Sequence, residues 1–337
     1  MRDFKNILMI NYGGIGDEIL FLSTIQSIKE QYPNSKITLA LEPRSKSIKN
    51  LCDDINDVMC VDIKAKGLKK YLNMMFFIMK TWFKGFDCVI SSGKSPLVAI
   101  ILFLTGIRQR VGYCSKMDFL LTKKVVLNEN QYAAKMYHDL VKPLINGTYQ
   151  NPYIKINDDE FSLPQGLNDN EYICIHPGVS KMSIQKNIFK CPKLYFWNEL
   201  IFGLLEKNQK VVLLGTNDDK DLVEKILDNK KISNHPNFIN YFKKTKNIKE
   251  MAFLMKHAKA VICVDSAPLH VAVCVKAKIF AIFGPTNDLK LTPRQDDIMV
   301  IENKIACRPC LWHIRQQNCE TSKCLNINPR LILDNIN

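Results

Sequence analysis

Short apolar runs alternate along the chain with longer segments in which apolar residues recur every three or four positions. The short runs suit buried strands and the longer segments suit amphipathic helices, so the pattern predicts βα units rather than hairpins. The strands predicted in the first half are Ile7 to Asn11, Lys36 to Leu41, Val58 to Asp62, Asp87 to Ser91 and Val125 to Leu127. The helices predicted between them are Glu18 to Gln31, Leu68 to Phe83, Ser95 to Leu104 and Tyr132 to Leu144.

The alternation stops between residues 146 and 170, which are rich in Asn, Asp, Pro and Gly, and then restarts. The later strands are predicted at Tyr172 to His176, Lys210 to Leu214, Phe238 to Tyr241, Ala260 to Val264 and Lys278 to Phe283. The later helices are predicted at Lys193 to Glu206, Asp218 to Leu227, Ile248 to His257 and Ala267 to Val275. We expect two Rossmann-like, doubly wound domains at residues 1–150 and 171–326, a linker at 151–170 and a C-terminal helix at 327–337. Two such halves predict a ligand cleft between them.

The chain is strongly basic, with 47 Lys and Arg against 33 Asp and Glu among its 337 residues, a net charge of +14. This charge favours an anionic partner such as nucleic acid, a membrane surface or a phosphorylated substrate. Only eight of the 47 basic residues are Arg, the residue preferred for bidentate base and phosphate recognition. We therefore expect diffuse attraction to anions and no nucleic-acid partner.

The apolar segments are too short for a signal peptide or a membrane span. The amino-terminal apolar run has four residues, and the most apolar stretch, Leu97 to Ile107, has 11 where about 20 are needed. The 12 Cys are scattered and too few for a disulfide scaffold. We expect a cytoplasmic protein with mostly reduced thiols and no transmembrane helix.

The first candidate site is a glycine-rich turn between a predicted strand and helix, containing Gly13, Gly14, Gly16 and Asp17. Its spacing matches neither the dinucleotide fingerprint nor the P-loop. The turn offers close backbone approach and a carboxylate at the carboxyl edge of a sheet. Alternatively, Asp17 only satisfies amides at the start of the helix.

The second candidate follows the strand at 260–264, where Asp265, Ser266 and His270 stand at the start of a predicted helix. A helix N-terminus with a hydroxyl and an imidazole is suited to an anion such as a diphosphate. The alternative is that Asp265 and Ser266 cap the helix while His270 packs on the sheet. The loop at 283–288, after the next strand, should lie beside this turn and help to wall the same site.

Further candidates are less specific. Gly178 lies in a turn after the strand at 172–176 and precedes a series of lysines that could face a leaving diphosphate or only solvent. Four cysteines, with His313 between them, could bind zinc, form a labile disulfide or remain free thiols: Cys307, Cys310, Cys319 and Cys324. A DxD-like triplet, Asp219-Lys220-Asp221, is a weak metal signal, and we expect no metal there.

In this order, the motifs resemble those of the bacterial glycosyltransferases of family 9, the lipopolysaccharide heptosyltransferase family. The matching segments read ILMINYGGIGDEILFLSTIQSIKEQYPNSKITLA, FDCVISSGKSPLVAIILFLTGIRQRVGY, ICIHPGVS, AKAVICVDSAPLHVAVCVKAKIFAIFGPTND and CRPC. They extend over nearly the whole chain. The resemblance implies a GT-B fold, in which two Rossmann-like domains face a central cleft, the N-terminal one for the acceptor and the C-terminal one for the nucleotide-sugar.

The resemblance also assigns roles to residues. It makes Asp17 the general base, and it places Asp265, Ser266 and His270 at the donor. Ala267 stands where the family has Gly, which keeps a backbone amide but leaves less room against a phosphate.

Asp219 and Lys190 are assigned by their positions relative to neighbouring motif residues of the family. Asp219, four residues after Gly215, matches a family acid that contacts the ribose. The family lysine before a Trp-Pro pair has no certain equivalent, because this chain reads Lys190-Cys191-Pro192, and Lys190 is our choice over Lys186.

The implied function is inverting, metal-independent and cofactor-free transfer of a sugar from a nucleotide-sugar, with ADP-heptose the expected donor. The expected acceptor is a lipid-linked oligosaccharide of the lipopolysaccharide core, which would bring the protein to the cytoplasmic leaflet of the inner membrane. Alternatives are another donor such as a UDP-hexosamine, or a non-catalytic protein that only binds nucleotide-sugars. A nicotinamide-dependent oxidoreductase would share the fold class, but its glycine fingerprint is missing.

Overall fold

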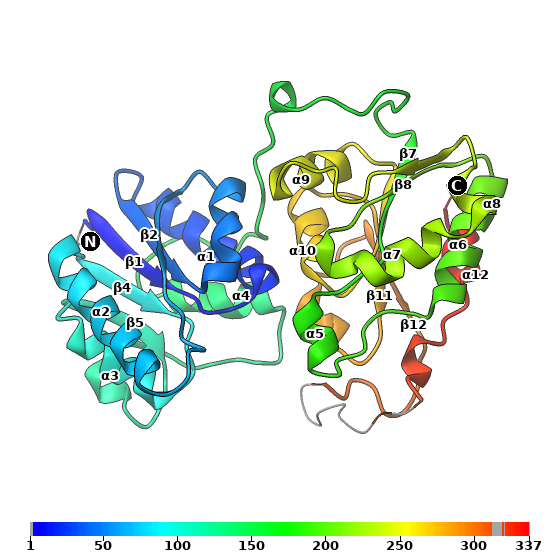
Figure 1. Cartoon of the computed structure of the whole chain (residues 1–337). Helices are drawn as coiled ribbons and strands as arrows, with labels where there is room; N and C mark the ends of the chain where they lie inside the picture. The colour runs from blue at the N-terminus through cyan, green and yellow to red at the C-terminus, as the bar shows by residue number, and fades with distance from the viewer. Residues whose placement is uncertain (1–2, 312–318, 320, 337) are drawn as a thin grey trace. The chain divides into compact units, whose positions relative to one another are not determined.

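The computed structural model describes residues 3–311, 319 and 321–336, and the chain folds as two compact units, Met1–Ile154 and Lys155–Asn337 (Figure 1). Each unit contains one six-stranded sheet in which every neighbouring pair of strands is parallel. Helices and loops connect the successive strands. The predicted pair of doubly wound, Rossmann-like α/β units is therefore confirmed.

The first unit has the strand order β3-β2-β1-β4-β5-β6. Its strands are β1 (Asn6–Ile10), β2 (Lys36–Leu41), β3 (Ile55–Cys60), β4 (Cys88–Ser91), β5 (Gln109–Tyr113) and β6 (Lys123–Val125). Its α-helices are α1 (Ile15–Gln31), α2 (Leu68–Lys84), α3 (Pro96–Leu104) and α4 (Ala133–His138). Its 3₁₀ helices are η1 (Pro43–Leu51), η2 (Asp118–Leu120) and η3 (Asp139–Val141).

The second unit repeats the plan with the order β12-β11-β10-β7-β8-β9. Its strands are β7 (Tyr172–His176), β8 (Lys210–Leu213), β9 (Phe238–Asn240), β10 (Ala260–Val264), β11 (Ile279–Phe283) and β12 (Ile298–Glu302). Its α-helices are α5 (Lys181–Gln185), α6 (Leu194–Glu206), α7 (Lys220–Leu227), α8 (Lys230–Ser233), α9 (Ile248–Lys256), α10 (Ala267–Cys274), α11 (Asp288–Leu291) and α12 (Arg330–Leu333). Its 3₁₀ helices are η4 (Asp158–Glu160), η5 (Asn217–Asp219) and η7 (Lys323–Leu325).

Several predicted elements are corrected by the structure. Each sheet has a sixth strand that the apolar pattern did not predict, because β5 carries polar residues and Gly112, and β12 is a half-exposed edge strand. The segment predicted as one helix from Tyr132 to Leu144 forms the shorter α4 followed by η3. The helix does not continue because Pro143 cannot donate a helical hydrogen bond. The strand predicted at residues 58–62 is β3, which begins three residues earlier and ends two residues earlier.

The structure places two of the predicted turn residues inside α1. The helix begins at Ile15 rather than at Glu18, so Gly16 and Asp17 lie in its first turn and not in the preceding loop. The C-terminal helix predicted at residues 327–337 is shorter than expected, because α12 forms one turn at Arg330–Leu333. Its Ile332 belongs to the same buried core as Trp197 of α6 and Ile175 of β7.

Candidate functional site

Asp17 lies in the first turn of α1, directly after β1. Gly14 is the N-cap, and its amide donates to Asp17 Oδ2 at 2.9 Å, so the carboxylate closes the start of the helix as the capping interpretation predicted. A Cβ at position 13 would lie 2.2 Å from Asp17 Cβ, which explains why Gly13 is glycine. The Asp17 side chain is nevertheless exposed and borders a cavity.

That cavity has a volume of about 390 Å³ and opens at the carboxyl ends of β1 and β4, within the first unit. Asp17 and Lys94 are the charged residues among its lining. The remaining lining residues are polar or apolar: Ile10, Asn11, Tyr12, Gly13, Ile63, Met74, Phe77, Ser91, Ser92, Gly93, Ser95, Val98, Ile101, Leu102 and Tyr137. The Ser95 hydroxyl accepts from the amide of Leu97 and so caps α3. Lys94 and Ser95 were not predicted as site residues, although they belong to a segment that carried the family resemblance.

Glu18, next to Asp17, is fully buried behind the glycine-rich turn. Its Oε1 accepts a hydrogen bond from the amide of Gly13 at 3.2 Å. Burial raises the pKa of Glu18 well above its ordinary value, and the charges of Asp17 and Glu42 raise it further. The hydrogen bonds from Gly13 and Asn11 only partly oppose this rise, so burial favours the protonated form of the carboxyl that fixes the turn.

In the second unit, Asp265 follows β10 and forms a buried ion pair with Lys190. Lys190 Nζ lies 2.9 Å from Asp265 Oδ2 and also donates to the Asp265 carbonyl oxygen at 3.3 Å. Burial alone would raise the pKa of Asp265. The ammonium of Lys190, hydrogen bonds from Lys190 and Thr286, and the charge of His270 outweigh burial and hold that pKa below its ordinary range.

Only one of the two candidate lysines lies at this ion pair. Lys190, and not the exposed Lys186, contacts the motif after β10. Thr286, which belongs to the loop predicted to wall the site, adds a contact that the sequence did not predict. The three loops meet because β10 pairs with β7 on one side and with β11 on the other.

Ser266 is the N-cap residue of α10, with extended backbone angles of φ −153° and ψ 178°. Its hydroxyl donates to the carbonyl oxygen of Val264 at 3.4 Å and makes no capping hydrogen bond, in contrast to the capping alternative. Ala267 is half-buried in the first turn, and His270 is buried one turn further along. A Ser hydroxyl, a helix N-terminus and an imidazole therefore stand together after β10.

Asp219 is turned into the protein. Its Oδ2 accepts from the amide of Thr216 at 2.7 Å and from its hydroxyl at 3.1 Å, and it lies 3.6 Å from His176 Nε2. Burial lowers the pKa of His176 despite the nearby Asp219 carboxylate, so this histidine is neutral. The carboxylate also lies against Gly178, where a Cβ would come within 1.9 Å of Asp219 Oδ1.

The cysteines near the C-terminus are free thiols. Burial and the neighbouring cysteines raise the pKa of Cys310, and they raise the pKa of Cys324 to about 11. Among residues 3–311, 319 and 321–336, no three His, Cys, Asp or Glu side chains are grouped to hold a metal ion. His313, the other predicted zinc ligand, lies outside the described residues. Within the same part of the chain, no helix is long and apolar enough to cross a membrane.

Comparison with known proteins identifies relatives over most of the chain. Residues 80–320 match the family described as glycosyltransferase family 9 (heptosyltransferase). Lipopolysaccharide heptosyltransferase 3 of Escherichia coli K12 is 24% identical over 302 residues, which cover 84% of each chain.

Two solved structures share the fold. The E. coli ADP-heptose lipopolysaccharide heptosyltransferase II aligns with a TM-score of 0.74 at 19% identity, covering 98% of this chain and 96% of that one. The E. coli heptosyltransferase WaaC with ADP-2-deoxy-2-fluoro heptose aligns with a TM-score of 0.69 at 16% identity, covering 98% and 99%. The predicted fold class therefore agrees with solved structures.

Proposed function

The chain belongs to glycosyltransferase family 9, and we propose that it transfers heptose from ADP-heptose to an acceptor of the lipopolysaccharide-core type. The relatives support the substrate class: one is a lipopolysaccharide heptosyltransferase, and one solved structure is a heptosyltransferase with an ADP-heptose analogue. The observation that carries the proposal is the cluster after β10, where Lys190 is fixed 2.9 Å from Asp265 beside the N-terminus of α10.

The donor diphosphate binds at this cluster in our proposal. The α10 N-terminus carries partial positive charge, and the hydroxyl of Ser266, the amide of Ala267 and the imidazole of His270 supply polar contacts. Lys190 adds a full positive charge, held in place by the buried Asp265 carboxylate. These fixed groups stabilise the charge that develops on the leaving diphosphate, so the transfer requires no metal ion.

Asp17 acts as the general base. The acceptor hydroxyl oxygen attacks the anomeric carbon while the Asp17 carboxylate takes its proton. The bond from that carbon to the diphosphate oxygen breaks, and the nucleoside diphosphate leaves with the electron pair. Because this is one displacement at one carbon, the configuration at the anomeric centre inverts. The exposed Asp17 side chain and its cavity support the assignment.

Asp265 and Asp219 have different relations to the donor. Asp265 is a positioning residue, because its buried carboxylate acts through Lys190. Asp219 supports the turn at Gly178, through which the backbone can approach the ribose and phosphates closely. A direct contact from Asp219 to the ribose, as the family resemblance implies, would require its carboxylate to turn away from Thr216.

The acceptor places the proposed reaction at a membrane surface. A lipopolysaccharide-core acceptor is lipid-linked, and we infer that the enzyme works in the cytoplasm, in peripheral contact with the inner leaflet. The net charge of +14 is consistent with an anionic surface.

A donor panel tests the proposal. The protein is incubated with ADP-heptose, UDP-hexosamines and other nucleotide-sugars, and binding and hydrolysis are followed by mass spectrometry. We expect ADP-heptose to bind and to be consumed. If the protein consumes only a UDP-hexosamine, that nucleotide-sugar and not ADP-heptose is the donor. If it binds a nucleotide-sugar without hydrolysis or transfer, it is a non-catalytic binding protein.

Calorimetry with ADP locates the diphosphate. We expect Ser266→Ala and His270→Ala each to weaken binding by about 1–3 kcal/mol, since each removes a contact to a charged group. If both variants bind ADP like the parent protein, the diphosphate does not lie at α10.

A further inference from the structure

Helix α2 exposes an unusual amount of apolar surface. Eight of its 17 residues are large hydrophobic side chains that face solvent: Leu68, Tyr71, Leu72, Met75, Phe76, Met79, Trp82 and Phe83. Phe83 is 85% exposed, Tyr71 72% and Trp82 60%. The inner face of the helix is already packed, because Phe77 and Thr81 are buried against the sheet. Helix α2 is therefore apolar on two faces, and only one of them is explained by the core.

Three of the four lysines of α2 form a narrow stripe beside this outer face. Lys69, Lys80 and Lys84 are spaced by three turns and one turn, so they lie on one side of the helix. The helix contains no acidic residue. An apolar face with Tyr and Trp, bordered by lysines, is the pattern of a helix that lies in a membrane interface.

The apolar surface continues onto α3. The indole Nε1 of Trp82 donates to the carbonyl oxygen of Leu104 at 3.0 Å, which joins the C-terminal ends of the two helices. Leu104 and its neighbour Phe103 are also exposed. The guanidinium of Arg110 lies 5.5 Å from the centre of the Phe103 ring, so this end of the surface also carries positive charge.

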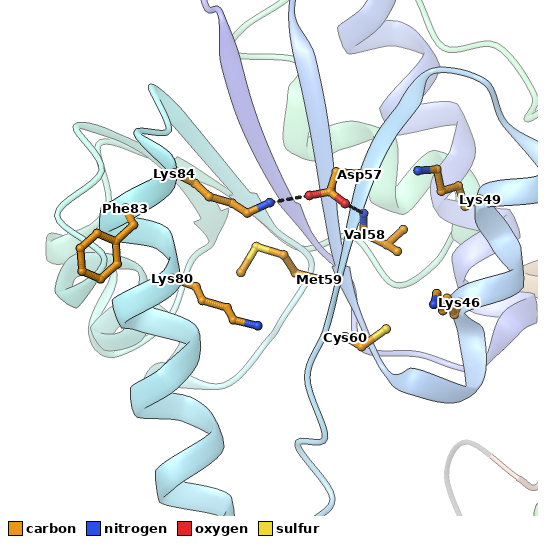
Figure 2. A pocket seen from close by; sticks show the side chains of 9 residues that line it. All are labelled: Lys46, Lys49, Asp57, Val58, Met59, Cys60, Lys80, Phe83 and Lys84. Atoms are coloured by element: carbon orange, nitrogen blue, oxygen red, sulfur yellow. Dashed lines mark hydrogen bonds and ion pairs between the residues drawn. The ribbon is translucent and has the colours of Figure 1, made fainter.

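A lysine-lined hollow adjoins the other side of α2 (Figure 2). It has a volume of about 650 Å³ and is lined by Lys46, Lys49, Asp57, Val58, Met59, Cys60, Lys80, Phe83 and Lys84. The one acid, Asp57, is paired with Lys84, and the hydrogen bond from Lys84 lowers the pKa of Asp57. Within the described residues, no ion pair joins Lys46 or Lys80 to a carboxylate. The hollow therefore has excess positive charge and fits an anionic group.

The lysines beside the apolar face favour an anionic bilayer over a second copy of the chain as the partner of this surface. A second copy docked through the same face would set lysines against identical lysines, which costs free energy. An anionic bilayer instead offers apolar chains to the aromatic face and phosphates to the lysines of the same helix.

We propose that α2, together with the hollow formed by Lys46, Lys49, Lys80 and Lys84, docks the protein on an anionic phospholipid bilayer. The apolar residues enter the boundary between headgroups and acyl chains, and the lysines meet headgroup phosphates. The inference extends the proposed function by naming the surface through which a lipid-linked acceptor is approached. It is tested without donor or acceptor, so it can fail while the proposed transfer holds.

The test is flotation of the full chain with vesicles of phosphatidylethanolamine and phosphatidylglycerol, compared with phosphatidylcholine vesicles. We expect binding to the anionic vesicles only, weakening as NaCl rises from about 0.05 to about 0.5 M. The double variant W82S/F83S should lose about tenfold or more of the partition coefficient, and K46Q/K80Q should lose at least about fivefold. The circular-dichroism spectrum and the thermal denaturation curve should stay unchanged in both variants, which verifies that the first unit is folded.

Matched variants in the second unit serve as controls. L289S/L331S removes two exposed apolar side chains from α11 and α12, and K220Q/K225Q removes two lysines from α7, so both should bind vesicles like the parent protein. Equal vesicle binding by W82S/F83S and the parent, with an unchanged thermal denaturation curve, would overturn the proposal. Sedimentation of the parent as a dimer, abolished by W82S/F83S and without vesicle binding, would overturn it in favour of a second copy.

Discussion

The carboxylate of Asp219 occupies the space that a side chain at position 178 would need. A Cβ on Gly178 would lie 1.9 Å from Asp219 Oδ1 and 2.6 Å from its Cγ, while Asp219 Oδ2 is bonded to Thr216. The loops after β7 and β8 are therefore fitted to each other, and a change at either residue must move the other.

Replacing Gly178 by Ala should consequently destabilise the second unit by about 1–3 kcal/mol, because the new methyl group displaces a hydrogen-bonded carboxylate. Thermal denaturation measures the effect. Gly147→Ala is the matched control, since a Cβ there meets no atom within 4 Å. Equal melting temperatures for the two variants would contradict the close approach.

Asp17→Asn should lower turnover by about 10²-fold or more and change donor affinity by no more than a few-fold, because the base acts on the acceptor's proton. The Asn side-chain oxygen can still accept from the amide of Gly14, so the start of α1 is preserved. Steady-state kinetics and calorimetry separate the two effects. An unchanged turnover would leave Asp17 with only its capping contact.

Lys190→Gln should weaken ADP binding by about ten- to a hundredfold, whereas Lys186→Gln should bind almost normally. The Lys190 change also leaves Asp265 buried without its cation, which raises the pKa of that carboxyl. A carboxyl whose pKa is lowered on folding stabilises the protein at neutral pH, and this stabilisation is lost on acidification. The variant should therefore lose more free energy of unfolding, relative to the parent, at pH 7 than near pH 4. Melting curves at both pH values check this, and equal losses would exclude the ion pair as the cause.

Glu18→Gln should stabilise the first unit as the pH rises. A carboxyl whose pKa is raised on folding binds more protons in the native state, so the parent protein loses stability above the ordinary pKa of Glu. A Gln side chain keeps an acceptor for the Gly13 amide without that cost. We expect a gain of at least about 1 kcal/mol at pH 8 and little gain at pH 4, measured by denaturant titration. A gain independent of pH would show that Glu18 is not protonated in the folded state.

Chelation with EDTA should leave the transfer rate unchanged, and added Mg²⁺ should not raise it, because Lys190 and the N-terminus of α10 stabilise the leaving diphosphate. Cys307, Cys310, Cys319 and Cys324 are free thiols in the structure, so elemental analysis of the purified protein should find no stoichiometric zinc. A rate that falls to background on chelation and returns with Mg²⁺ or Mn²⁺ would refute the metal-free mechanism.

The sequence determined the architecture because its signals are local. Buried parallel strands such as β2, β7 and β10 are mainly apolar runs, and their predicted bounds agree with the structure. Short or half-exposed strands such as β5 and β12 lack that signal, since their places depend on neighbours in the sheet. The order of motifs likewise indicated the family before any geometry was known.

Only the tertiary structure decided which residues touch. Lys190 and Asp265 are 75 positions apart, and the adjacency of β7 and β10 brings the pair together. The inward turn of Asp219 and the buried Glu18 depend in the same way on packing across elements. The sequence predicted that α2 is a helix but did not predict its exposed apolar face. Periodicity does not reveal which of two apolar faces the sheet covers.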